Sequence, residues 1–254
     1  MEFEFWNLEP VPSSILFEDN HLLIVNKRPG EIVQGDKTGD EPLSETLKSY
    51  IKTKYNKPGE VFLGVVHRLD RPVSGAVIFA RTSKALTRMN ELLKNREIRK
   101  VYWAVCPRPV PPPIGVRSKG GGQTDDWILL THYLKKNEQQ NKSYVYDLQG
   151  EGRLKAELKY RKIASGDRYD LLEVELLTGR HHQIRVQLAA TGCPIKGDLK
   201  YGFPRSNPDG SISLHARLVE FVHPVSKEKI RILADPPNDA LWDFLSGIAM
   251  NSSI

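Results

Sequence analysis

Short strand-forming segments, each closed by a turn signal, most limit what this chain can fold into. Four such segments, rich in β-branched and aromatic residues, lie in the second half of the chain at residues 127–134, 142–148, 155–164 and 168–177. The last two are separated by S-G-D, which is typical of a hairpin turn. Because strands outnumber helices and most connections suit antiparallel pairing, we expect an α+β fold around a large, mostly antiparallel sheet.

The remaining segments predict further strands and four helices. Strands are expected at residues 15–18, 21–27, 64–69, 75–80, 99–106, 212–224 and 229–235. The spacing of apolar residues predicts helices at residues 42–55, 82–98, 179–192 and 236–250. The expected caps are Ser44, either Thr82 or Ser83, and Thr178, with Gly192 as the stop after the third helix.

The domain organisation depends on one irregular stretch. A length of 254 residues suits one large domain or two small ones. Residues 107–126 are Pro-rich and then Gly-rich, so they are not expected to form regular structure. They either join two subdomains or form a mobile loop over a site.

Charge and cysteine usage narrow the class of protein. Lysine and arginine number 37 against 31 acidic residues, a net charge of +6 that favours an anionic partner, nucleic acid first. Cys106 and Cys193 stand far apart without a C-x-x-C pair, so we expect reduced thiols and no metal site. The sequence shows no signal peptide and no apolar run of about 20 residues, so we expect a cytoplasmic protein without a membrane segment.

The first candidate site is an acid between two cations. Asp70 follows an apolar segment and lies between Arg68 and Arg71 in H-R-L-D-R. Strand ends on a rigid scaffold are where catalytic residues gather, and a fixed, ionised carboxylate can act as a nucleophile or base. The alternative is a structural ion pair. His67 is read as a hydrogen-bonded structural histidine rather than as a base.

Two other enzyme classes fit this cluster poorly. A protein kinase would carry H-R-D, a Gly-rich loop directly after a strand, V-A-I-K and D-F-G, and the sequence shows none of these patterns. A glycosidase would need a second carboxylate in a comparable setting, and none is evident.

The second candidate site is the start of the third expected helix, in T-G-R-H-H-Q-I-R. A helix N-terminus attracts anions, and Arg180 and Arg185 would add two positive charges there. The alternative is that both arginines form surface ion pairs. Adjacent His181 and His182 point about 100° apart on a helix, so they are not expected to bind one metal ion.

These motifs together resemble the RluA-type family of RNA pseudouridine synthases. H-R-L-D-R-P-V-S-G, R-K-V-Y-W-A and L-L-T-G-R-H-H-Q-I-R carry the resemblance, and flanking matches extend it over about residues 15–235. Pro72, Val73 and His181 depart from the common pattern of the family. The resemblance implies a pseudouridine synthase catalytic fold, with a mixed sheet, flanking helices and a basic cleft.

The resemblance also implies roles for individual residues. Asp70 would be the catalytic residue, Tyr102 would lie against the target base, and Arg180 would pair with the catalytic carboxylate. Arg68 would hold the flipped-out nucleotide or fill the gap that it leaves, and Arg71 would also serve RNA. Further expected substrate and RNA contacts are His67, Gln183, Ile184, Arg185 and Lys27.

The expected function is isomerisation of uridine to pseudouridine in structured ribosomal or transfer RNA, without cofactor or metal. Asp70 would attack the base or the ribose, or assist elimination to a glycal, and the sequence does not choose among these routes. We expect a single catalytic domain over residues 1–254, without a separate N-terminal RNA-binding domain, acting as a monomer. The alternative is a non-catalytic RNA-binding module of the same fold.

Overall fold

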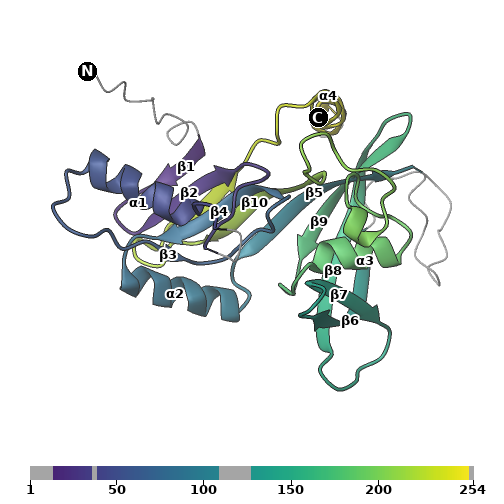
Figure 1. Cartoon of the computed structure of the whole chain (residues 1–254), viewed down its shortest axis with the longest axis horizontal. Helices are drawn as coiled ribbons and strands as arrows, with labels where there is room; N and C mark the ends of the chain where they lie inside the picture. Colours follow the sequence, from purple (N-terminus) through teal and green to yellow (C-terminus); the bar gives the residue numbers. More distant parts are fainter. Residues whose placement is uncertain (1–13, 36–38, 109–126, 252–254) are drawn as a thin grey trace.

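One sheet of eleven strands organises the chain in a computed structural model that describes residues 14–35, 39–108 and 127–251 (Figure 1). The strands are β1 (Ile15–Glu18), β2 (Leu22–Lys27), β3 (Gly64–Val65), β4 (Ser74–Ala80), β5 (Arg99–Pro107), β6 (Ile128–Asn137), β7 (Lys142–Tyr146), β8 (Leu154–Ser165), β9 (Tyr169–Leu176), β10 (Leu214–Val222) and β11 (Lys229–Leu233). The helices are α1 (Leu43–Lys54), α2 (Ser83–Lys94), α3 (Gln183–Ala190), α4 (Ala240–Asn251) and the 3-10 turn η2 (Leu199–Tyr201).

The strand order is β1-β2-β4-β10-β5-β9-β8-β6-β7, with β3 paired to β4 and β11 paired to β10. Among the pairs between described strands, only β4 and β10 run parallel. The predicted α+β fold with a large, mostly antiparallel sheet is therefore confirmed. Figure 1 shows α4 on one side of the sheet, and α2 and α3 on the other.

Alternation along β5 explains this layering. Side chains of successive strand residues point to opposite faces of a sheet. Tyr102 and Ala104 pack in the cluster that includes α3, whereas Trp103 and Val105 pack against α4. Strand β5 is thus buried on both faces, and one of its faces lies under the start of α3.

The predicted N-cap residue is confirmed for α2 and is wrong for α1 and α3. The Thr82 side chain accepts a hydrogen bond from the Ala85 amide at 3.1 Å, as predicted for α2. Pro42, not Ser44, precedes α1, and Ser44 is buried inside the helix. Helix α3 begins at Gln183 rather than near residue 179, because His182 adopts the left-handed conformation with φ 51°.

Two other expectations have different outcomes. The strand expected over residues 64–69 is limited to β3, and the chain from residue 66 to residue 73 has no regular structure. Residues 109–126, which make up nearly all of the expected linker or loop, lie outside the described residues. Within the described ranges, no helix is long and apolar enough to cross a membrane.

Gly75 permits the close crossing of β4 and β10, the parallel pair. Its φ of 117° lies in the region that favours glycine, and a Cβ atom there would lie 2.4 Å from the backbone N and O atoms of Ala216. Because Ala216 pairs with Tyr102 on the next strand, this contact sets the spacing between β4 and the strand that carries Tyr102.

Replacing Gly75 by Ala should lower the free energy of unfolding by at least about 2 kcal/mol, since the backbone of β10 must move to accept the methyl group. Urea denaturation followed by circular dichroism measures the change. Gly59→Ala is the control, because a Cβ atom at Gly59 would have no heavy atom within 4 Å. Equal stability of the two variants would contradict the close crossing.

Candidate active site

A cleft of about 960 Å³ lies where four segments meet. The segments are the end of α2, the first half of β5, the irregular chain after β3, and the turn that leads into α3. They contribute, among others, Leu93, Lys94, Arg96, Ile98, Arg99, Lys100, Tyr102, His67, Arg68, Leu69, Asp70, Thr178, Gly179, Arg180, His181, His182 and Arg185. The two motif clusters that are far apart in the sequence thus line one cleft.

Asp70 lies in this cleft with one carboxylate oxygen held. Its side chain is 31% exposed, and Oδ2 accepts a hydrogen bond from Arg185 Nη1 at 2.8 Å. The same oxygen lies 3.4 Å from His182 Nε2. The amide of Val73 donates to the Asp70 carbonyl at 3.0 Å, which closes the turn after the acid. The contacts with Arg185 and His182 are both made by the Oδ2 atom.

Arg185 is fixed from behind by a second acid. Its Nε and Nη2 atoms donate to the two oxygens of Asp198 at 2.7 and 2.8 Å, a bidentate pair in which both side chains are buried. Burial disfavours the guanidinium charge, but hydrogen bonds and charge from Asp198 and Asp70 outweigh it and raise the pKa of Arg185. Arg185 is therefore a permanent cation that presents one N–H to Asp70.

His182 is the other neighbour of the acid, and a chain of hydrogen bonds sets its tautomer. The Ser143 amide donates to the Tyr201 hydroxyl at 2.9 Å, and that hydroxyl lies 2.8 Å from His182 Nδ1. Burial lowers the pKa of His182 to about 3 against the raising effect of Asp70, so the ring is neutral. With Nδ1 accepting from Tyr201, Nε2 carries the hydrogen that faces Asp70.

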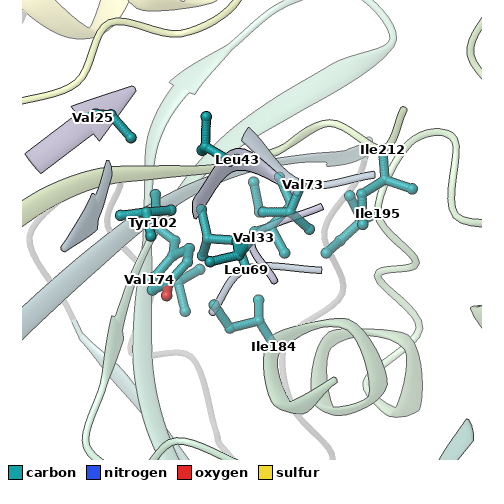
Figure 2. Packing of buried hydrophobic residues seen from close by; sticks show 14 of the residues in the cluster. Val25, Val33, Leu43, Leu69, Val73, Tyr102, Val174, Ile184, Ile195 and Ile212 are labelled. Atoms are coloured by element: carbon teal, nitrogen blue, oxygen red, sulfur yellow. The ribbon is translucent and has the colours of Figure 1, made fainter. Parts of the chain in front are cut away.

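A cluster of buried hydrophobic residues adjoins the segment that carries the acid. Leu69, Val73, Tyr102 and Ile184 are all at most 8% exposed and belong to this cluster (Figure 2). Burial, and then the charge of Asp70, raise the pKa of the Tyr102 phenol, which is therefore protonated at neutral pH. The cleft offers an aromatic face and an anionic oxygen within a mostly apolar wall.

The rest of the cleft is basic. Seven lysine and arginine side chains line it against three carboxylates, those of Asp70, Glu157 and Glu175. Such a lining attracts an anionic ligand. Within the described residues, no group of three or more histidine, cysteine and acidic side chains is placed to hold a metal ion.

Comparison with known proteins then decides the family. A sequence model described as RNA pseudouridylate synthase matches residues 21–190, a span that includes Asp70, Tyr102 and Arg185. The chain belongs to this family. The RluA-type resemblance is thereby confirmed, and the chain is an RNA pseudouridine synthase.

Relatives from distant organisms match this pseudouridine synthase over most of its length. It is 33% identical to ribosomal large subunit pseudouridine synthase D of Xanthomonas campestris, over 91% of this chain and 68% of the relative. It is 30% identical to a mitochondrial pseudouridylate synthase of Xenopus tropicalis, over 91% of this chain and 78% of the relative. The fold is similar to that of human RNA pseudouridylate synthase domain containing 4, with a TM-score of 0.73 at 20% identity and 94% coverage of both chains.

One predicted contact of this synthase is wrong. Arg180 was expected to pair with Asp70, but Arg185 forms that pair, and Arg180 Nε donates to the Lys155 carbonyl at 3.1 Å. The cause is the late start of α3. Arg180 lies in the turn before the helix, at the exposed side of the cleft, whereas Arg185 lies on the buried helix face.

Lys27 and Gln183, both predicted to contact RNA, are buried, and of the two only Gln183 lines the cleft. Lys27 is 1% exposed and donates to the carbonyls of Arg28, Arg71 and Val73, so it supports the turn that carries Asp70. Burial lowers the pKa of Lys27 to about 8. The Gln183 amide accepts from Thr178 and Arg180 and donates to the Glu157 carbonyl, which holds the turn before α3.

The other predicted RNA contacts differ in their access to the cleft. Arg68 is exposed and lines it, and Ile184 is 4% exposed in its wall. His67 lines the cleft and accepts a hydrogen bond from the Ile78 amide. Arg71 does not line it and pairs with Asp40 at 2.7 Å.

Sequence reasoning assigned no role to His182, Tyr201 or Asp198, which position the acid. His182 was considered only as a metal ligand. Asp198 and Tyr201 lie in I-K-G-D-L-K-Y-G, a segment that the family resemblance covered without indicating a role. A buried acid and phenol shortly after an arginine-bearing helix were the available signal.

Arg185→Met should lower the free energy of unfolding by about 3–5 kcal/mol, since it leaves Asp198 buried and unpaired. Arg180→Met is the matched control and should change stability by less than about 1 kcal/mol, because Arg180 is exposed. Urea denaturation at neutral pH measures both. A larger loss in the Arg180 variant would contradict the arrangement.

Acidification should destabilise the protein partly through His182. Its pKa is about 3 when folded and near 6.5 when unfolded, so the unfolded state binds the extra proton between these values. Stability should therefore fall as pH drops from about 6.5 toward 4, with His182 contributing up to about 1.4 kcal/mol per pH unit. His182→Gln should lose this contribution in urea denaturation at several pH values. Parallel curves for variant and wild type would contradict the lowered pKa of His182 in the folded state.

Proposed function

We propose that this enzyme converts uridine to pseudouridine in ribosomal RNA with Asp70 as the catalytic carboxylate. The observation that carries the proposal is the Asp70 carboxylate, held on Oδ2 by Arg185 beside a buried tyrosine in a basic cleft.

The reaction sets the demands on these residues. The bond between uracil N1 and ribose C1′ breaks, a bond between C5 and C1′ forms, the proton on C5 leaves, and N1 gains a proton. Attack by Asp70 on the base, attack on the ribose, and assisted elimination all require an ionised carboxylate at the same place. Arg185 supports the charge of that carboxylate and fixes its orientation.

Tyr102 and the apolar residues around it fit the second demand, which is to retain the detached base. Water in the site would let the uracil escape before the new bond forms. The buried Tyr102 ring offers a stacking face, and Leu69 and Ile184 complete an apolar wall. Because its phenol pKa is raised, Tyr102 contacts the base as a neutral group.

Arg68 fits the third demand, access to the base. A uridine inside a helix must be extruded at a cost of a few kcal/mol, and a cation can hold the distorted backbone. Arg68 is exposed at the cleft two residues before Asp70. Arg180 lines the same cleft and does not pair with Asp70, so we also assign it to RNA binding.

Ribosomal RNA is proposed because several relatives are named ribosomal large subunit pseudouridine synthases. We also propose one catalytic domain that acts as a monomer, because both motif clusters meet in one cleft within a single chain. A cytoplasmic location is proposed with it, since ribosomal RNA is the proposed substrate. Mapping of pseudouridines in total RNA from cells with and without the protein tests the substrate. Loss of a site confined to transfer RNA would overturn the ribosomal assignment and keep the chemistry.

Asp70→Asn should abolish release of tritium from C5 of labelled uridine, because the amide is a poor nucleophile and carries no charge. RNA binding measured on the same preparation by filter retention should persist. Asp40→Asn is the control, since Asp40 also pairs with an arginine but does not line the cleft, and it should keep wild-type turnover. Turnover by folded Asp70→Asn would overturn the mechanism.

A further inference from the structure

Lys100 lies in the cleft close to the proposed catalytic residues, yet the proposed mechanism gives it no role. It precedes Tyr102 by two residues on β5, so the two side chains share one face of the sheet, about 7 Å apart along the strand. Lys100 is half-buried and lines the cleft. Its ammonium group therefore belongs to the surface that substrate RNA meets.

Lys100 differs from the other cations of the cleft in its environment. Arg99 pairs with Glu175 at 3.0 Å, and Arg185 pairs with both Asp70 and Asp198. Lys94, Arg96, Arg68 and Arg180 are exposed to solvent. Among the described residues, no carboxylate lies within ion-pair distance of Lys100, and burial lowers its pKa. A charge withdrawn from water without a counter-ion is unfavourable until an anion arrives.

His67 supplies a second donor at the same part of the cleft. Its Nε2 atom accepts a hydrogen bond from the Ile78 amide at 3.2 Å, so in the neutral ring the hydrogen is on Nδ1. Burial, and then the nearby Lys100 charge, lower the pKa of His67 to about 3, which keeps the ring neutral. His67 also lines the cleft. It can donate a hydrogen bond but brings no acid that would satisfy Lys100.

Gly179 leaves the space beside the ammonium open. A Cβ atom at Gly179 would lie 3.6 Å from Lys100 Nζ, which places the T-G-R turn next to this lysine. The surroundings therefore combine a desolvated ammonium, an imidazole N–H and a backbone without a side chain. Hydrogen-bond donors without a nearby carboxylate suit a phosphate oxygen.

We propose that Lys100 and His67 form a seat for one phosphodiester of the substrate RNA, next to the nucleotide held at Asp70. The inference rests on the proposed function, because it takes the target uridine to lie against Tyr102. Lys100 lies two residues before Tyr102 on the same face of β5. A phosphate bound there would fix the RNA backbone relative to the base that reacts at Tyr102. Lys100 is thus a positioning residue that restricts how the strand enters the cleft.

The test measures binding of a twelve-residue oligouridylate by fluorescence anisotropy at several salt concentrations. Each phosphate contact to a single strand contributes about 0.7 to the slope of log affinity against log salt. Lys100→Met should reduce the slope by about 0.7, and Lys100→Arg should retain it. Lys52→Met is the control, since Lys52 is exposed on α1 and outside the cleft. An unchanged slope in Lys100→Met, or an equal reduction in Lys52→Met, would overturn the seat.

A second measurement detects the phosphate directly. In protein whose lysines carry ¹³C-methyl groups, the resonance missing from Lys100→Met reports the pKa of Lys100. That pKa should be below the usual lysine value in the free protein and should rise when the oligouridylate is added. No rise at saturation would overturn the seat.

These outcomes are separate from a failure of the proposed chemistry. Turnover by Asp70→Asn would overturn the catalytic assignment while leaving the slope and pKa results of Lys100 intact. An Asp70-dependent reaction in which Lys100→Met leaves the slope unchanged, and the pKa of Lys100 does not rise with the oligouridylate, would overturn the seat alone.

Discussion

The contact between Arg185 and Asp70 is the interaction on which the site depends. An arginine with a single carboxylate partner can change its orientation. In Arg185, the bidentate pair with Asp198 uses Nε and Nη2 and fixes the guanidinium, so that Nη1 donates to Asp70. Arg185, in the first turn of α3, therefore links Asp198, directly before η2, to Asp70 in the turn between β3 and β4. Removing the guanidinium would both release the acid and leave Asp198 as a buried charge without a partner.

Neutral histidines complement this cation. A second positive charge beside Asp70 would compete with Arg185, whereas a neutral ring adds a hydrogen-bond donor without adding charge. Burial keeps His182 neutral, and Tyr201 directs its hydrogen toward the acid. His67, which also lines the cleft, is likewise a neutral ring, and the Ile78 amide sets its tautomer. The site therefore uses one fixed cation and two neutral donors.

Sequence patterns predicted most of the architecture because alternation and helical spacing report directly which faces are buried. They predicted β4, β5 and β8 closely, and they placed Asp70 and the T-G-R motif as site elements. They failed where the chain leaves regular structure. The left-handed backbone of His182 has no signature in apolar spacing, so α3 was started too early and Arg180 was expected where Arg185 lies. Lys27 was expected to contact RNA, but its ammonium group donates to three backbone carbonyls in the interior. The sequence alone does not distinguish such a lysine from one exposed to solvent.

The position of β10 in the sheet has a consequence for biosynthesis. Strand β10 lies between β4 and β5, yet it follows both in the chain by more than a hundred residues. On the ribosome, the strands that flank Asp70 and Tyr102 emerge long before the strand that joins them. Until β10 is made, an edge of β4 and an edge of β5 stay open for wrong partners. The nascent chain therefore acquires its catalytic geometry only when synthesis has passed residue 222.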